Sequence, residues 1–480
     1  MANSIKKNLG FQTIYQILNT CLPLITGPYL ARVLGATQLG VFSYTSSVVS
    51  YFTLIAILGT VNYGTRSIAS VKDDVMLRSK KFCEIYSLQL GTSIIAIILY
   101  VIYVAGFDHE NTIISVIQII AIISCACDIS WLFFGLESFK TTLTINLIFR
   151  IATVLAILVL VKSPKDLWIY ALLMLGGTLL AQLFLWIYVP RYIRFLKISC
   201  KDIICHLKPN LLLFIPLLAM SVYHTMDKTM LGLLSTYEQT GYYYNSDKVI
   251  NIPLCIINGV GTVMLPRMTS LYNLGRKEEG NKLFLISLEC IAVVSIAMAF
   301  GIAAIAKEFV PLFFGNGYDS CVSLVVVLAP VLIIKGLSNT VRTQYLIPLS
   351  LETIFTKSVI AGAITNLIFN ILLIPKMGAM GAVIGTLLAE LVACIWQFIC
   401  IYKTIDLNRS LCNCFVYLGA GIIMFVCVRV VAIVLIPIWI KITLEIIVGI
   451  IVYFIICLAF WKISNSKMYR MILHIFLDKN

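Results

Sequence analysis

The sequence predicts an all-α polytopic membrane protein with about 14 transmembrane helices and no soluble domain. The composition is the first reason, because 60% of the residues are hydrophobic, only 12% are charged and the mean hydropathy is +0.98. The second reason is that apolar runs of about 18 or more residues follow one another with short polar breaks. The third is an internal repeat, which divides the chain into two similar sets of helices.

Each apolar run is long enough to cross the hydrocarbon core of a bilayer. The first seven runs are Leu9–Leu34, Leu39–Tyr63, Glu84–Val104, Thr112–Leu136, Thr141–Val161, Leu167–Val189 and Asn210–Leu233. The second seven are Gly241–Leu265, Phe284–Ala306, Val322–Ile347, Lys357–Ile374, Gly378–Tyr402, Phe415–Ile436 and Lys441–Lys462.

The basic residues of the breaks predict the orientation. Alternate breaks, counted from the N-terminus, hold about 24 Lys and Arg, against about 6 in the other breaks. Because basic residues resist translocation, we expect a multi-pass protein of the cell (cytoplasmic) membrane with both termini in the cytoplasm. The same residues produce the net charge of +14. They are scattered without a basic face, so nucleic acid is not expected as a partner.

Two segments of the first half return in the second half. Asn146–Phe149 has the sequence Asn-Leu-Ile-Phe and returns as Asn366–Phe369, and Gly177–Gln182 returns as Gly385–Glu390 with one change. The fifth and sixth runs therefore resemble the eleventh and twelfth. Gly40 and Arg66 are also spaced as Gly241 and Arg267 are.

The repeat predicts the domain organisation. Its unit is about 200 residues, or six helices, and an even number of spans places both copies the same way up in the membrane. We expect an N-terminal lobe over 1–205 (helices 1–6), a C-terminal lobe over 206–405 (helices 7–12), and helices 13 and 14 with a cytoplasmic tail over 406–480. Two such repeated lobes are expected to leave a cleft between them.

Six strong cations lie inside the apolar runs, and each would cost about 2.5 to 3.5 kcal/mol if it faced lipid at the centre of the bilayer. They are Arg150, Lys228, Lys248, Lys335, Arg342 and Arg429. We therefore expect them to line a wet interior. Since the spans hold few acids, a cation left unpaired in a cleft would bind an anion such as a diphosphate or a carboxylated sugar.

The polar residues of the runs follow helical faces. Lys335, Asn339 and Arg342 are spaced i, i+4, i+7, which stacks them on one face of a helix. The same spacing recurs in Asn146, Arg150 and Thr153 and, without charge, in Gln12, Gln16 and Asn19. The predicted substrate-binding residues of the central cavity are Arg150, Lys335, Arg342, Lys228, Lys248, Asn339, Asn146, Asn251 and Gln16.

Acidic residues inside the runs allow two interpretations. Asp227 precedes Lys228 and Asp247 precedes Lys248. Neighbours point about 100° apart on a helix, so pairing of Asp227 with Lys248, or of Asp247 with Lys228, is expected across helices. Such pairs would fix helix register or serve function. Asp128 and Glu390 lie deep in their runs, and each is a candidate protonatable group or the partner of a cation such as Arg150.

Two Cys-x-Cys pairs, Cys125 with Cys127 and Cys412 with Cys414, lack a second pair or a histidine at zinc spacing. We expect no metal, no cofactor and no catalytic residues, and the protein is not predicted to be an enzyme.

Several segments resemble the lipid-linked oligosaccharide flippases of bacterial polysaccharide synthesis. These O-antigen and capsule repeat-unit flippases belong to the multidrug/oligosaccharidyl-lipid/polysaccharide exporter superfamily. The similarity rests on Leu22–Gly35, which reads LPLITGPYLARVLG, on Asn62–Ala69, on Phe313–Tyr318 and on Gly378–Ala382. It covers the first twelve helices, and helices 13 and 14 agree with a fourteen-helix member.

This resemblance implies two six-helix lobes in a V shape around a central cavity, which opens alternately to each side of the membrane. The implied substrate is a polyprenyl-diphosphate-linked oligosaccharide, turned from the cytoplasmic to the outer leaflet. Coupling to an ion gradient is implied as well. No residue here matches a coupling motif of the family, and Asp128, Asp227 and Asp247 are candidates only because they are acids inside the runs. Polysaccharide-assembly proteins are implied partners, and a monomer suffices for the cleft.

Two other classes remain open. A membrane polysaccharide polymerase or ligase would handle similar lipids, but its large external loop has no counterpart here. The longest external break is about fifteen residues, Lys307–Cys321. A multidrug exporter of the same superfamily would favour acids in its cavity, whereas this cavity is predicted to be basic.

Overall fold

The computed structural model describes the backbone of residues 2–434 and 437–464, without the side chains of 2–21, 215–217, 219 and 222. Over these residues the chain is helical between short connections and contains no β-strand. It divides into two compact units, Met1–Gly241 and Tyr242–Asn480. The predicted all-α polytopic fold is confirmed.

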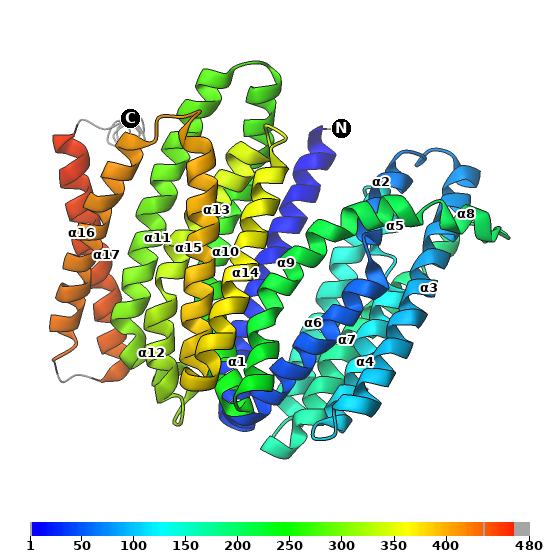
Figure 1. Ribbon diagram of the computed structural model, residues 1–480, viewed down its shortest axis with the longest axis horizontal. Coiled ribbons are helices and arrows are strands. Elements are labelled where there is room, and N and C mark those ends of the chain that lie inside the picture. Colours follow the sequence, from blue (N-terminus) through cyan, green and yellow to red (C-terminus); the bar gives the residue numbers. More distant parts are fainter. Residues whose placement is uncertain (1, 435–436, 465–480) are drawn as a thin grey trace. The chain divides into compact units, whose positions relative to one another are not determined.

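The helices of the N-terminal unit are long and joined by short turns (Figure 1). They are α1 (Ala2–Ile57), α2 (Thr60–Ala69), α3 (Val75–Phe107), α4 (Thr112–Cys127), α5 (Ser130–Gly135), α6 (Phe139–Leu160), α7 (Leu167–Trp186), α8 (Cys200–Ile204) and α9 (Leu207–Leu234). Single 3-10 turns, Pro164–Asp166 and Val189–Arg191, flank α7.

α10 (Tyr237–Asn273) begins in the N-terminal unit and continues into the C-terminal unit. The helices that follow are α11 (Lys277–Phe314), α12 (Asp319–Leu328), α13 (Pro330–Val341), α14 (Glu352–Met377), α15 (Ala379–Tyr402), α16 (Asn408–Val431) and α17 (Ile438–Ile463). A π-helical turn, η3 (Arg342–Leu346), directly continues α13.

Among the described residues, 12 helical segments are long and apolar enough to cross a membrane. The first of them, Leu22–Ala69, takes in part of the predicted run Leu9–Leu34 and all of the predicted run Leu39–Tyr63. The backbone kinks between these runs at Gly35 (φ 76°, ψ 171°), a conformation that glycine adopts without steric cost. The seventh predicted run lies in α9, where some side chains are not described.

Packing assigns α9 to the N-terminal unit, where it lies against α1. The division of the chain by its repeat, into 1–205, 206–405 and 406–480, rests on matched sequence and stays a prediction. The V-shaped arrangement of the two lobes likewise stays a prediction.

Two glycines that the repeat matches, Gly40 and Gly241, lie against each other where α1 meets the start of α10. A Cβ atom on Gly40 would lie 1.6 Å from the carbonyl oxygen of Tyr237. A Cβ atom on Gly241 would lie 1.9 Å from the carbonyl oxygen of Ala36. Neither position has room for a side chain, so these glycines permit the close backbone contact.

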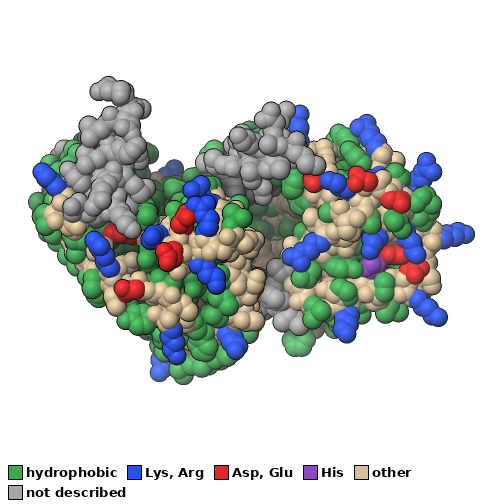
Figure 2. Space-filling view, turned by 90° about the horizontal axis from the view of Figure 1, so that it is seen from above, with side chains coloured by type: hydrophobic (Ala, Val, Ile, Leu, Met, Phe, Trp, Pro, Cys, Tyr) green, Lys and Arg blue, Asp and Glu red, His purple; other side chains and the backbone are tan. Residues whose placement is uncertain are grey.

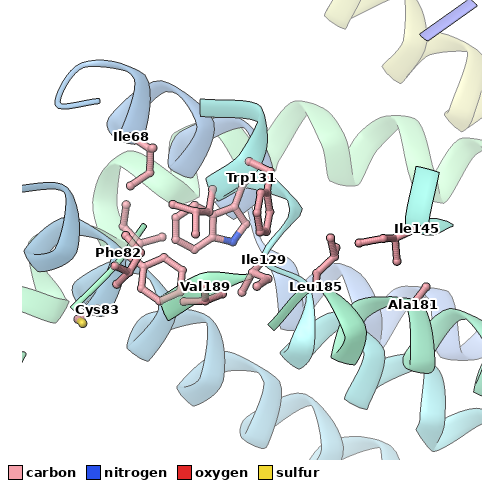
Figure 3. Close-up of a cluster of buried hydrophobic side chains, with 13 residues drawn as sticks. Ile68, Phe82, Cys83, Ile129, Trp131, Ile145, Ala181, Leu185 and Val189 are labelled. Carbon is pink, nitrogen blue, oxygen red and sulfur yellow. The ribbon is translucent and has the colours of Figure 1, made fainter. Parts of the chain in front are cut away.

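One apolar core of the N-terminal unit surrounds Trp131 of α5 (Figure 3). Its indole Nε1 donates a hydrogen bond to Oε1 of Gln89 at 3.0 Å, and Phe82 lies against the ring. A Cβ atom on Gly64 would lie 2.6 Å from the indole. A buried Trp needs a partner for its N–H. The short helix α5 is therefore fixed against α2 and α3 by both packing and a hydrogen bond.

The last two helices pack on α11 in the C-terminal unit, as Figure 1 shows. Tyr453 of α17 donates a hydrogen bond to the carbonyl oxygen of Val293 at 3.0 Å. On α16, a Cβ atom on Gly421 would lie 2.5 Å from the ring of Phe300. The three helices form one apolar core.

Figure 2 shows the face on which α2 and α8 lie, with Lys and Arg side chains spread over it. Exposed residues of the N-terminal unit at this end include Lys80, Arg194 and Lys201. They belong to the breaks that the basic-residue count assigns to the cytoplasm.

Candidate functional site

Lys335, in the middle of α13, forms an ion pair with Glu390 of α15. Its Nζ lies 3.1 Å from Oε1 of Glu390, and both side chains are largely buried. The expectation that few acids would neutralise Lys335 is wrong, because its partner lies in a helix distant in sequence. Pairing of Glu390 with a cation, one of its two predicted interpretations, is confirmed.

Asn339, one turn beyond Lys335, contacts α10. Its Nδ2 donates a hydrogen bond to Oδ1 of Asn258 at 2.9 Å. A Cβ atom on Gly261 would lie 3.0 Å from Oγ1 of Thr343 and 3.3 Å from Nδ2 of Asn339. The close approach of α10 and α13 therefore places two amide side chains together on a partly exposed surface.

Arg342 occupies the first position of the π-helical turn. The backbone N–H of Ile347 donates to its carbonyl oxygen at 3.0 Å, the spacing of a π-helix. Its guanidinium carbon lies 4.6 Å from the ring centre of Phe355 on α14. Lys335, Asn339 and Arg342 thus contact three different helices, α15, α10 and α14, although their spacing stacks them along α13.

Arg150 of α6 and Arg342 are alike in one respect: within the described part of the chain, neither forms an ion pair with an acidic residue. Both side chains are partly exposed. Thr153, from the stripe of Arg150, lies against α7, since a Cβ atom on Gly177 would be 2.0 Å from its Oγ1. Arginine stays charged in proteins, so each guanidinium requires an anion, an aromatic face or water.

The polar residues of α10 interact along their own helix. Asn251 donates from Nδ2 to Oδ1 of Asp247 at 3.0 Å. The Nζ of Lys248 lies 3.9 Å from the ring centre of Tyr244, a cation–π contact one turn away. Both contacts orient these side chains along α10.

Asp227 is buried and Lys228 half-buried on α9. The predicted pairs, Asp227 with Lys248 and Asp247 with Lys228, each join one unit to the other, and they stay predictions. Asn146 is half-buried on α6, and the side chain of Gln16 lies outside the described residues.

Asp128 marks the break between α4 and α5. Its Oδ1 accepts a hydrogen bond from the backbone N–H of Ser130 at 2.8 Å, and its carbonyl oxygen accepts one from Nε2 of Gln89 at 2.8 Å. Both contacts fix the start of α5. No ion pair with Arg150 is present among the described residues, and coupling roles for Asp128, Asp227 and Asp247 stay predictions.

Three polar networks were not predicted. Glu84 of α3 accepts a hydrogen bond at 2.8 Å from Nε2 of the buried His206, whose Nδ1 lies 2.6 Å from the hydroxyl of Tyr63. Glu289 of α11 accepts hydrogen bonds from Tyr417 and Asn413 of α16.

The third network joins Glu308, Arg429, Lys441 and Glu445, from α11, α16 and α17. Sequence offered one signal for these networks, namely acidic residues inside or beside apolar runs. It carried no information on the partners, which lie far away along the chain.

The comparison with protein families matches residues 5–272, more than half of the chain, to the family described as polysaccharide biosynthesis protein. A relative in Escherichia coli (strain K12), named "Putative O-antigen transporter", is 24% identical over 395 residues, which are 81% of this chain and 94% of that protein. A protein of the same name from Shigella dysenteriae is 24% identical and is covered over 99% of its length.

A third relative, the lipid II flippase MurJ of Bacillus subtilis (strain 168), is 22% identical over 184 residues, 38% of this chain and 32% of that protein. Among solved structures, a lipid II flippase MurJ in an inward closed conformation covers 95% of this chain and 100% of its own, with a TM-score of 0.77 and 14% identity. An inward-facing multidrug resistance transporter of the MATE family covers 82% of this chain and 96% of its own, with a TM-score of 0.63 and 14% identity. At these identities the structures show a common fold.

Proposed function

The chain belongs to the polysaccharide biosynthesis protein family, and from this premise we propose that it is a flippase for lipid-linked oligosaccharides. It moves polyprenyl-diphosphate-linked repeat units from the cytoplasmic to the outer leaflet of the cell membrane by alternating access. Two relatives that match over nearly their full length carry the name of O-antigen transporters, and a third carries the name of a lipid flippase. These names support transport rather than catalysis.

The observation that carries the proposal is that Arg150 of the N-terminal unit and Arg342 of the C-terminal unit each lie inside a membrane-spanning segment and form no ion pair with a described acidic residue. A diphosphate supplies the missing negative charge, and the planar guanidinium donates two hydrogen bonds to it. Asn146 and Asn339, each within one turn of its arginine, supply amides for sugar hydroxyls. A cationic drug would be repelled by the same arginines.

Further parts of the proposal follow from the sequence. Lys228, Lys248, Lys335, Asn251 and Gln16 complete the substrate-binding set. Transport is coupled to an ion gradient, both termini lie in the cytoplasm, and the protein acts as a monomer beside other polysaccharide-assembly proteins. Asp128, Asp227 and Asp247 are the proposed coupling residues within the twelve repeated helices.

Flipping of a polyprenyl-diphosphate oligosaccharide in proteoliposomes tests the arginines. The exposure of the glycan to an added glycosidase is followed for wild type, Arg150→Met and Arg342→Met. Losing one charge-assisted hydrogen bond, worth about 1.5 to 3 kcal/mol, should slow flipping by about tenfold or more in each variant. Arg276→Met is the control, because this exposed arginine pairs only locally, with Glu279 at 2.6 Å.

Unchanged flipping in well-folded Arg150→Met and Arg342→Met would contradict the proposed diphosphate site. If wild-type protein flips none of several glycans and instead transports a cationic dye, the multidrug exporter would replace the flippase.

Lys335 requires a double variant, because Lys335→Met alone leaves the carboxylate of Glu390 buried without its partner. Lys335→Met combined with Glu390→Gln removes both charges. If Lys335 binds substrate, the double variant stays slow although its folding recovers. If the pair only joins α13 to α15, the double variant regains wild-type flipping, and Lys335 is no longer counted among the substrate-binding residues.

A further inference from the structure

A second charged cluster lies in the C-terminal unit, where α16 and α17 pack on α11. Glu308 of α11 is its centre: Nη1 of Arg429 lies 2.8 Å from Oε2, and Nζ of Lys441 lies 3.8 Å from Oε1. Arg429 also donates from Nη1 to the carbonyl oxygen of Ala304 at 3.0 Å. Both carboxylate oxygens of Glu308 are therefore engaged by cations.

Glu445 of α17 belongs to this cluster but is not satisfied by it. Its side chain is fully buried, and neither carboxylate oxygen accepts a hydrogen bond from any described residue. It lies on the buried face of α17 with Ile442, Gly449 and Tyr453. One turn away the packing is tight, because a Cβ atom on Gly449 would lie 3.3 Å from Cγ2 of Val428.

Two opposing effects act on the charge of Glu445. Burial without a hydrogen-bond donor disfavours the carboxylate and favours the neutral acid. The charged groups around it are Glu308 from α11, Arg429 from α16 and Lys441 from α17 itself. With Glu445 ionised the four charges sum to zero, whereas with Glu445 protonated they sum to +1. The charge of Glu308 adds to the effect of burial, whereas Lys441 and Arg429 favour the carboxylate.

The position of Glu445 permits proton exchange at one end of the membrane. It is seven residues from the first residue of α17, or about 10 Å along the helix. Between it and that end lie Lys441 and Arg429, whose side chains are 19% and 31% exposed. Both cations act electrostatically on Glu445, and both side chains are partly exposed near this end of the helices.

We propose that Glu445 is a proton-binding site, which takes up a proton from the end of α17 at Lys441 and releases it to the same end. The site differs from Asp128, Asp227 and Asp247 because it lies in α17, outside the repeated helices. Protonation changes the cluster from neutral to +1 and so alters the attachment of α16 and α17 to α11. Its use in driving transport rests on the proposed flippase function, but proton binding itself does not.

Infrared difference spectroscopy of the purified full-length protein tests proton binding without any substrate. Spectra are recorded between about pH 8 and about pH 5, a range in which ordinary exposed carboxyl groups remain mostly ionised. Wild type should gain a protonated-carboxyl band as the pH falls. Glu445→Gln, which keeps the shape without the acid, should lose that band, whereas Glu279→Gln, at an exposed site, should keep it.

Glu445→Asp makes the result independent of how well the glutamine variant folds. An aspartic acid absorbs at a different frequency, so the titrating band should move rather than vanish. A band that persists unchanged in both variants, or the absence of any titrating band in wild type, would overturn the proposal. If wild-type protein flips its substrate normally but shows no titrating band, the proposed proton site is wrong and the proposed flippase function stands.

Discussion

Arg342 and Arg429 are two arginines of the same unit, both inside apolar runs, and their surroundings differ. Arg429 contacts the carboxylate of Glu308 and the carbonyl oxygen of Ala304. Arg342 lies over the ring of Phe355, and no described acidic residue pairs with it. The comparison teaches that a charge within a span needs a partner, and that the packing of the helices decides whether the protein provides one. Where the protein provides no acidic partner, a bound ligand can supply the opposite charge.

The largest effect is expected on removal of Arg429. Arg429→Met leaves the buried Glu308 with only Lys441 at 3.8 Å, and breaking a buried ion pair from one side costs about 3 to 5 kcal/mol. The free energy of unfolding, measured in mixed micelles by titration with a denaturing detergent, should fall by about that amount.

The double variant Arg429→Met with Glu308→Gln is the matched control. It leaves no unpaired carboxylate at position 308, so much of the lost stability should return. If the single variant is as stable as wild type, the ion pair with Glu308 does not stabilise the protein. Arg429 and Arg342 would then not differ in how the protein compensates their charge.

The all-α polytopic fold could be predicted from the sequence because each membrane span is a continuous apolar run of a minimum length. It also revealed the repeat, and the matched residues Gly40 and Gly241 meet in the structure. It could not reveal the partners of the charges. Glu308 is 121 residues from Arg429, so their contact depends on how α16 packs against α11.

The same limit explains the errors in the predicted site. Lys335 was expected to lack an acidic partner because the spans hold few acids, yet Glu390 reaches it from α15. Pairing of Asp128 with Arg150, one of its predicted alternatives, is not seen among the described residues, where its carboxylate accepts a hydrogen bond from the backbone of α5. Spacing predicted which side chains share a face of α13, but the neighbours of that face are a tertiary property.

Substitution of Arg342 should change stability less than substitution of Arg429 does, and it should affect flipping more than stability. Arg342→Met removes a cation–π contact that is worth about 0.5 to 1 kcal/mol at a partly exposed site, and it leaves no carboxylate unpaired. Unfolding in the same mixed micelles should change by about that amount, although flipping should be strongly slowed. A loss of stability as large as that of Arg429→Met would assign Arg342 to the structure rather than to the substrate.

The smallest effect is expected at an exposed ion pair, which separates burial from charge as the cause of these differences. Lys72 and Glu137 lie 3.3 Å apart with 38% and 66% of their side chains exposed. Water and salt screen such a pair, so Lys72→Met should change the free energy of unfolding by about 0.5 kcal/mol or less. Raising the salt concentration should abolish even this difference while leaving the effect of Arg429→Met almost unchanged. If Lys72→Met costs as much as Arg429→Met, charge pairing alone sets the scale, and burial does not distinguish the two arginines.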